Sequence, residues 1–280
     1  MEAEAREKIA MAAVLLNREQ YEDAEQMVEG VDLPVIKPSL EAGNVFLDLA
    51  DWNLEKGLWP EGAGHMLKFA RAVQVDKSDL TDEATRGLLC VAPTLVAAGD
   101  IDGYHRFVWE TIDHFGQTQN PIAAEQVVKI CALLPCDESL LDALEPLGDI
   151  LRQSVDNVRI WSTWDAYLHA WRVWALALLE YRLGNYEDAA SWSRENLMSR
   201  DSTPSRAAMD HIILAMSLYQ AGSVEESLDQ LQSGKNMIAT GLPYGLSRVV
   251  EVGSNTEGFW WDWVAARILL LEAESLMGNP

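Results

Sequence analysis

A short turn that recurs along the chain is the feature that most constrains its fold. Its clearest copy, RLGNY at 182–186, lies between an apolar helical stretch and a second stretch that opens on Glu-Asp-Ala. Glycine suits this place because a helix that ends and reverses within two or three residues commonly needs a left-handed residue after its last turn. Similar turns are centred on positions 19, 57, 99, 184 and 222, with Glu19 in the glycine's place in the first. The chain is therefore predicted to be a series of helical hairpins.

The spacing of the turns predicts one further hairpin. The interval from 99 to 184 is about twice as long as the others, which indicates a unit that lacks the glycine turn. The segment 121–134, opened by Asn120-Pro121 as cap and first helical residue, supplies its first helix, and 139–155 supplies its second. A small residue five positions after the turn centre, as at Ala24, Ala189 and Ser227, lets the second helix lie close to the first.

The fold class predicted from these patterns is all-α. Alternating β-branched runs are nearly absent, and 248–252 is the only segment in which a strand is considered. We expect a right-handed α-α superhelix, or solenoid, of about six helical hairpins plus a C-terminal capping helix, in a single domain over 1–280. The expected units are 1–36, 40–76, 80–117, 120–157, 162–200 and 203–239, followed by a loop over 240–258 and the capping helix over 259–278.

Charge narrows the class of partner. Lys and Arg total 21 against 44 Asp and Glu, which gives a formal net charge of −23. This charge repels phosphate, so neither nucleic acid nor an anionic membrane is expected as a partner. A protein or peptide that carries basic residues fits the charge better. No uncharged run approaches the roughly 20 residues that a membrane span needs.

The cysteines and the N-terminus bear on the cellular setting. Cys90, Cys131 and Cys136 are odd in number and lie in apolar helical contexts, which favours buried, reduced thiols over a disulfide framework. The first residues are acidic and amphipathic and lack the features of a secretory signal. A cytoplasmic protein is expected. Because the first residues already lie within the helical pattern, the chain also fits a fragment of a longer protein.

The hairpin pattern resembles a tetratricopeptide repeat. The segment Leu183–Ala189 matches the turn of that family, and Leu176-Ala177 stands where the family places its Leu-Gly pair. The likeness covers about five units and recurs at Met11-Ala12, Leu49-Ala50, Val91-Ala92 and Leu214-Ala215. The resemblance implies a binding scaffold and says little about what is bound.

Residues 98–121 carry a more specific resemblance to one group of tetratricopeptide proteins. Residues 98–106, 114–118 and Asn120-Pro121 resemble the tetratricopeptide regions attached to bacterial serine/threonine kinases of planctomycete type, and the Trp-Asp-Trp at 261–263 fits them as well. The chain has no G-x-G-x-x-G loop, no His-Arg-Asp and no Asp-Phe-Gly. The resemblance therefore implies a regulatory or interaction domain and carries no catalytic residue over.

Signatures of catalysis and metal binding are weak. The sequence has no Walker loop, G-x-S-x-G elbow, H-E-x-x-H or paired C-x-x-C. Asp165 and His169 lie four residues apart and could share a metal or a proton, although a local hydrogen bond or a solvated pair is the favoured interpretation. Cys131 and Cys136 are likewise assigned to the core. No enzyme, catalytic residue, metal or cofactor is predicted.

Aromatic residues supply the strongest functional hypothesis. At helical spacing, Trp164, Trp171 and Trp174 cluster on one side of a helix. In tetratricopeptide-like arrays the equivalent positions line a concave groove, where aromatic burial and a guanidinium hold a peptide. Alternatively, these rings pack against the preceding unit. The predicted groove residues are Trp171, Trp174, Leu178, Tyr181 and Arg182, continued by Met209, Ile212, Met216 and Tyr219.

Two classes of function follow. The first is a non-enzymatic protein–protein interaction scaffold that binds a peptide or protein on its concave face. The second is a regulatory or sensory domain of a kinase-like signalling protein that binds a small molecule or self-associates. A pocket enclosed by Trp161, Trp164 and the loop over 240–258 would favour the second class. Ionisable groups that converge on a cleft floor would revive the enzyme hypothesis.

Overall fold

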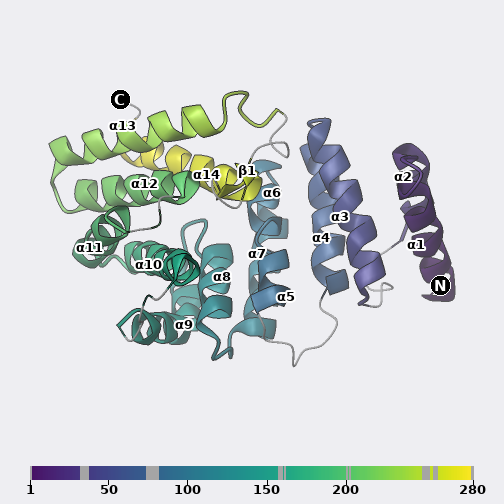
Figure 1. The fold of residues 1–280 in the computed structure, drawn as a ribbon, viewed down its shortest axis with the longest axis horizontal. Coiled ribbons are helices and arrows are strands. Elements are labelled where there is room, and N and C mark those ends of the chain that lie inside the picture. The colour runs from purple at the N-terminus through teal and green to yellow at the C-terminus, as the bar shows by residue number, and fades with distance from the viewer. Residues whose placement is uncertain are drawn as a thin grey trace.

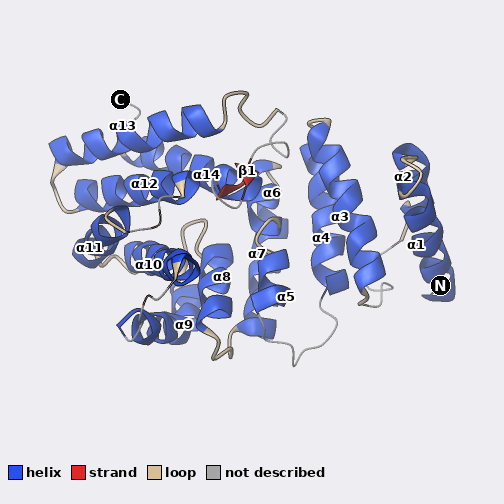
Figure 2. Ribbon diagram, in the orientation of Figure 1, coloured by secondary structure: helices blue, strands red, loops and turns tan. Residues whose placement is uncertain are grey.

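The computed structural model describes residues 2–31, 38–73, 82–156, 160, 162–199, 201, 203–247, 253–254 and 258–278. The fold is all-α, as predicted, and a two-residue antiparallel pairing is the only strand pair in these ranges (Figure 2). The elements are α1 (Glu2–Leu16), α2 (Tyr21–Val28), α3 (Leu40–Glu55), α4 (Trp59–Val73), α5 (Asp82–Gly87), α6 (Val91–Ala97), α7 (Ile101–Phe115), α8 (Pro121–Cys131), α9 (Glu138–Asp156), α10 (Thr163–Arg182), α11 (Tyr186–Leu197), α12 (Pro204–Gln220), α13 (Val224–Gly241), β1 (Gly253–Ser254), β2 (Gly258–Phe259) and α14 (Trp260–Leu276).

Consecutive helices pair as hairpins, and each hairpin packs on the next (Figure 1). Within the hairpins α1 packs on α2, α3 on α4, α8 on α9, α10 on α11 and α12 on α13. Between them, α1 contacts α3, α4 contacts α6, α8 contacts α10, and α11 contacts α12. The predicted strand segment 248–252 lies outside the described residues.

The recurrent turns share one geometry. At each, the residue after the turn centre donates its N–H to a carbonyl five residues back, as Asn185 does to Glu180 at 2.9 Å. This bond, with a left-handed residue at the centre, is the Schellman ending of a helix. The left-handed conformation is adopted by Glu19 (φ 60°), Gly57 (75°), Gly99 (78°), Gly184 (81°) and Gly222 (86°). The prediction that these positions end helices is confirmed at all five.

The small residues after the turns are fully buried, as expected from a close approach of the paired helices. Ala24, Ala189 and Ser227 are each 0% exposed. The third hairpin departs from the pattern because Tyr104 takes the small residue's place. Its hydroxyl donates to the carbonyl of Cys131 at 3.0 Å, so the larger side chain bonds α7 to the end of α8.

The unit without a glycine turn is also present. The Asn120 side chain accepts a hydrogen bond from the backbone N–H of Ile122 at 2.9 Å, and Pro121 opens α8, which α9 follows. In the preceding unit the first helix is divided into α5 and α6 by a turn at 88–90.

Helix α14 does not simply cover the last hairpin, as the predicted capping helix would. It packs against α12 and α13 and also against α6, far back in the chain, and Figure 1 shows it beside these helices. Trp263, Val264, Ala266, Leu269 and Ala273 are all buried. A helix that is apolar around most of its circumference is stable only with neighbours on several sides. That requirement explains why α14 crosses the array instead of closing its end.

Candidate functional site

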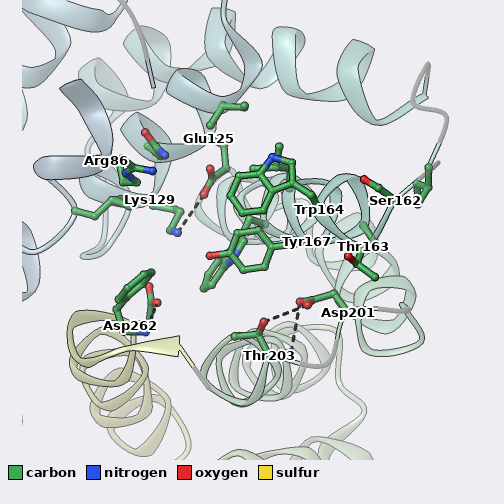
Figure 3. A pocket seen from close by; sticks show the side chains of 18 of the residues that line it. Arg86, Glu125, Lys129, Ser162, Thr163, Trp164, Tyr167, Asp201, Thr203 and Asp262 are labelled. Carbon is green, nitrogen blue, oxygen red and sulfur yellow. Dashed lines mark hydrogen bonds and ion pairs between the residues drawn. The ribbon is translucent and has the colours of Figure 1, made fainter. Parts of the chain in front are cut away.

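A cleft of about 870 Å³ lies between α8, α10 and the start of α14 (Figure 3). We call it the aromatic cleft. Its defining residues are Glu125 and Lys129 from α8, Trp164, Tyr167 and Trp171 from α10, and Trp261 and Asp262 from α14. Arg86 from α5, and Asp201 and Thr203 before α12, complete its rim.

One wall is a row of rings on α10. The helix begins at a capping box in which Ser162 Oγ accepts from the backbone N–H of Asp165, and the Asp165 carboxylate accepts from the backbone N–H of Ser162. Spacings of three and four residues then place the rings on one face. Trp164 and Tyr167 are stacked, with centroids 5.3 Å apart and planes 15° apart. Tyr167 meets Trp171 edge to face at 6.2 Å. Trp164 is 59% exposed, so one aromatic surface is open to a ligand.

The opposite wall comes from β2 and α14. Phe259 and Trp261 stack with ring centroids 4.4 Å apart and planes 9° apart. The Nε1 atom of Trp261 is buried and has no hydrogen-bond partner in the described part of the chain. The two walls belong to helices almost a hundred residues apart in the chain, and packing of α14 across the array brings them together.

Charged groups lie deep in the cleft. The Lys129 ammonium is 3.1 Å from Glu125 Oε1, and the two side chains are only 10% and 4% exposed. The same ammonium lies 3.7 Å from the centroid of the Trp171 ring, a cation–π geometry. Burial raises the pKa of Glu125, and Lys129 opposes that rise. The cleft thus holds an internal cation between a carboxylate and a ring.

Asp262 adds a second buried carboxylate. Its Oδ2 accepts the backbone N–H of Phe259 at 3.0 Å and so caps α14. Burial raises the pKa of Asp262 as well, and Lys129 and the Phe259 N–H oppose the rise. The pKa of the Tyr167 hydroxyl is raised to about 12 by its burial and by the Asp262 carboxylate. Tyr167 therefore keeps its proton at neutral pH and can donate a hydrogen bond.

The carboxylate at the rim is already neutralised. Asp201 Oδ2 is 2.8 Å from the Arg206 guanidinium, and Asp201 Oδ1 accepts from the Thr203 hydroxyl at 3.2 Å. Arg206 is 1% exposed and also pairs with the fully buried Asp210 at 3.1 Å. This network anchors the start of α12 and positions Thr203 at the edge of the cleft.

Of the nine predicted groove residues, Trp171 lines the aromatic cleft. Trp174 and Met209 lie deeper and border a small hollow beside Trp261 and Asp262. Most of the others are packed in the core, contrary to the expectation of an open groove. The buried ones are Leu178, Tyr181, Ile212 and Met216, while Tyr219 is half-buried. Their role in partner binding stays a prediction.

Arg182, the cation of the predicted groove, is occupied within the chain. Its Nε donates to the Ala132 carbonyl and its Nη2 to the Leu133 carbonyl, both at 2.9 Å. Nη2 also pairs with Glu272 Oε2 at 2.8 Å. The side chain thereby joins α10 to the end of α8 and to α14.

The minor candidates have structural explanations. Asp165 belongs to the α10 capping box, while His169 borders a separate, smaller hollow with Glu195 and Met198. All three cysteines are free thiols, with Cys90 and Cys131 buried as predicted and Cys136 half-buried. Within the described ranges, no group of three or more His, Cys, Asp or Glu could hold a metal ion. No helix there has the length and apolar character of a membrane span.

Sequence reasoning identified one wall of the cleft and missed its charged groups. Trp164 and Trp171 were visible as a stripe, and the spacing of Glu125 and Lys129 was an available signal for an ion pair. No signal in the sequence indicates that α14 places Asp262 near Glu125 and Lys129. Trp161, named in the alternative hypothesis, lies outside the described residues, as does most of the loop after 247; Trp164 does line the cleft.

Comparisons with known proteins found no match: no protein-family model fits the chain, and neither a curated protein nor a solved structure is significantly similar to it.

Proposed function

We propose that this chain is a non-enzymatic binding domain of tetratricopeptide-like, right-handed superhelical architecture, which captures a peptide segment of a partner protein in the aromatic cleft. The observation that carries the proposal is the cleft itself. It combines an exposed Trp164 surface, a second aromatic wall at Phe259 and Trp261, and buried polar groups between them. Concave sites with apolar walls and a few fixed polar groups are the usual form of a binding site.

Two features support the architectural part. The five turns repeat one hydrogen-bond pattern, and each hairpin packs on its neighbour in chain order. This is the arrangement in which every unit buries its apolar face against the next.

The cleft is a better binding surface than the groove predicted over α10 and α12. A partner that reached Trp174 or Met216 would have to displace α14, whose residues Trp263, Val264 and Leu269 are buried. Exposing each such side chain costs about 1.5–3 kcal/mol, and the Arg182–Glu272 pair would be lost as well. Binding beside α14 avoids these costs.

A phage-displayed library of random dodecapeptides tests the proposal. Enriched peptides should lose affinity for a Trp164→Ala variant by about tenfold or more, since aromatic anchors dominate such sites. Trp109→Ala is the matched control, because Trp109 is also exposed, at 44%, but lies on α7 away from the cleft. Peptides that bind wild type and Trp164→Ala equally would show that the aromatic cleft is not the binding site.

The second candidate is a sensory domain that binds a small molecule in the same cleft. The cavity volume of about 870 Å³ favours it, because it falls in the range of about 300–1,000 Å³ typical of small-molecule sites. A thermal-shift screen with a metabolite library would separate the two. Stabilisation of wild type and Trp109→Ala, but not of Trp164→Ala, would support this candidate over the peptide.

A further inference from the structure

The aromatic cleft already contains one buried cation, the ammonium group of Lys129. The Lys129 ammonium is buried against the Trp171 ring and held by Glu125. An ammonium removed from water is stable only where a carboxylate and an electron-rich ring replace its hydration. The deep half of the cleft therefore binds a cation, which in this structure is the ammonium group of Lys129.

The charges that face the cleft leave room for a second cation. Glu125 and Asp262 are 3% and 4% exposed, and among the described lining residues Lys129 is the one buried cation that acts on both. Arg172 acts on Glu125 from outside the lining. Asp201 is neutralised by Arg206, and Arg86 is exposed at the rim, where solvent screens it. The buried part of the lining thus holds two carboxyl groups and one ammonium.

The open half of the cleft has the shape for a planar cation. Trp164 offers its exposed face, backed by Tyr167, and the Phe259–Trp261 stack lies across the cleft. Guanidinium is planar, weakly hydrated and stacks on indole, which makes it a better fit here than a compact ammonium. The net charge of −23 favours the approach of a basic partner.

We infer that the aromatic cleft recognises an arginine side chain of its partner peptide, stacked on Trp164 and balanced by the buried Glu125–Lys129–Asp262 cluster. This inference rests on the proposed function and names its ligand chemistry.

A pair of synthetic peptides tests it: acetyl-Gly-Gly-Arg-Gly-Gly-amide and the same peptide with citrulline, a neutral isostere, in place of arginine. Dissociation constants come from NMR titrations that follow the indole N–H of Trp261, which every variant retains. The arginine peptide should bind about tenfold tighter than the citrulline peptide, the equivalent of one cation–π contact with partial desolvation. That preference should disappear in Trp164→Ala and persist in Trp109→Ala.

Removing the internal cation gives an independent test. In Lys129→Met the two buried carboxylates have lost their shared ammonium, so the arginine peptide should bind severalfold tighter than to wild type. Lys235→Met, which removes an exposed pair with Glu274, is the control and should change nothing. Weaker arginine binding by folded Lys129→Met would overturn the inference, because it would mean that Lys129 does not compete with the guanidinium for the buried carboxylates.

The outcomes separate the inference from the proposed function. If library peptides without arginine bind in a manner that depends on Trp164, the binding function stands and the arginine inference fails. Equal affinity of the arginine and citrulline peptides, or no response to either, also overturns the inference. If no peptide of any sequence depends on Trp164, the proposed function fails.

Discussion

Ion pairs in the N-terminal hairpins and in the C-terminal region differ in how far they are exposed to solvent. In the N-terminal hairpins α1–α4, the ion pair between Lys56 and Glu22 lies at the surface, with side chains 42% and 75% exposed. In the region from α8 to α14, the Arg182–Glu272 pair is largely buried, and Arg206 and Asp210 are buried completely. Helix α14 packs against α12 and α13, and its Glu272 forms the buried pair with Arg182, whereas the Arg194–Glu226 and Lys235–Glu274 pairs on the outer side of these hairpins stay exposed. Within the described ranges, no such helix lies over α1–α4.

This contrast separates two sources of stability. The N-terminal hairpins depend on apolar contact between neighbours, and their surface pairs contribute little. In the C-terminal region the buried pairs fix where α14 lies, and a buried charge left alone is costly. The aromatic cleft exists only in the region that α14 covers.

The largest expected effect is at Arg182. In Arg182→Met the Glu272 carboxylate and two carbonyls lose their donor, which should lower the free energy of unfolding by about 3–5 kcal/mol. Lys56→Met removes the exposed pair with Glu22 and should cost far less, because solvent screens that pair. Urea unfolding monitored by circular dichroism measures both. Equal losses would contradict the contrast between the regions.

The next effect concerns Gly258, where β2 leads into α14. Gly258 has φ 93°, and a Cβ there would overlap Ser205 Oγ. Gly258→Ala should therefore cost about 3 kcal/mol, since both strain and a clash oppose it. Gly57→Ala, at φ 75° with open space around the site, should cost about 1–2 kcal/mol from the backbone alone. Thermal unfolding measures the melting temperatures of both variants. A lower melting temperature for Gly57→Ala than for Gly258→Ala would contradict this prediction.

A pH-dependent effect is expected at Asp51 on α3. Burial and the neighbouring carboxylates of Asp48 and Glu55 raise its pKa to about 7. The folded state therefore binds a proton that the unfolded state, with a pKa near 3.9, releases, so Asp51 lowers stability as pH rises from about 4 to about 7.

Asp51→Asn should remove this dependence and stabilise the protein by about 4 kcal/mol at pH 8, with little change at pH 4. Urea denaturation across this pH range provides the measurement. Asp229→Asn, an exposed site on α13, is the control and should leave the profile unchanged. A stabilisation that is equal at pH 4 and pH 8 would exclude the titration of Asp51 as its cause.

The smallest effect is at the first turn. Glu19 adopts φ 60°, a conformation that the other four turns assign to glycine. Glu19→Gly should stabilise the protein by about 0.5–1 kcal/mol by relieving that strain, partly offset by the greater freedom of glycine when unfolded. Glu19→Ala keeps the left-handed strain and is the control. Its free energy of unfolding, measured by urea denaturation, should not exceed that of the wild type.

The sequence predicts local features of this fold well and long-range ones poorly. The Schellman turns at Gly184 and its equivalents depend on a few adjacent residues, and so does the Asn120 cap; both could be read directly. The position of α14 depends on contact with α6, which no local pattern encodes. For that reason the Trp171 stripe was found, and its packing against the preceding unit was one of the two interpretations, while its pairing with Lys129 was not predicted.

The crossing of α14 over the array has a consequence for biosynthesis. Hairpins of a repeat protein can ordinarily fold one after another as they leave the ribosome, each completed by its neighbour. Here α14 is translated after α6 and α12, yet it packs against both. Their apolar faces stay open during synthesis until α14 emerges, so this half of the protein should be the part that needs chaperone protection.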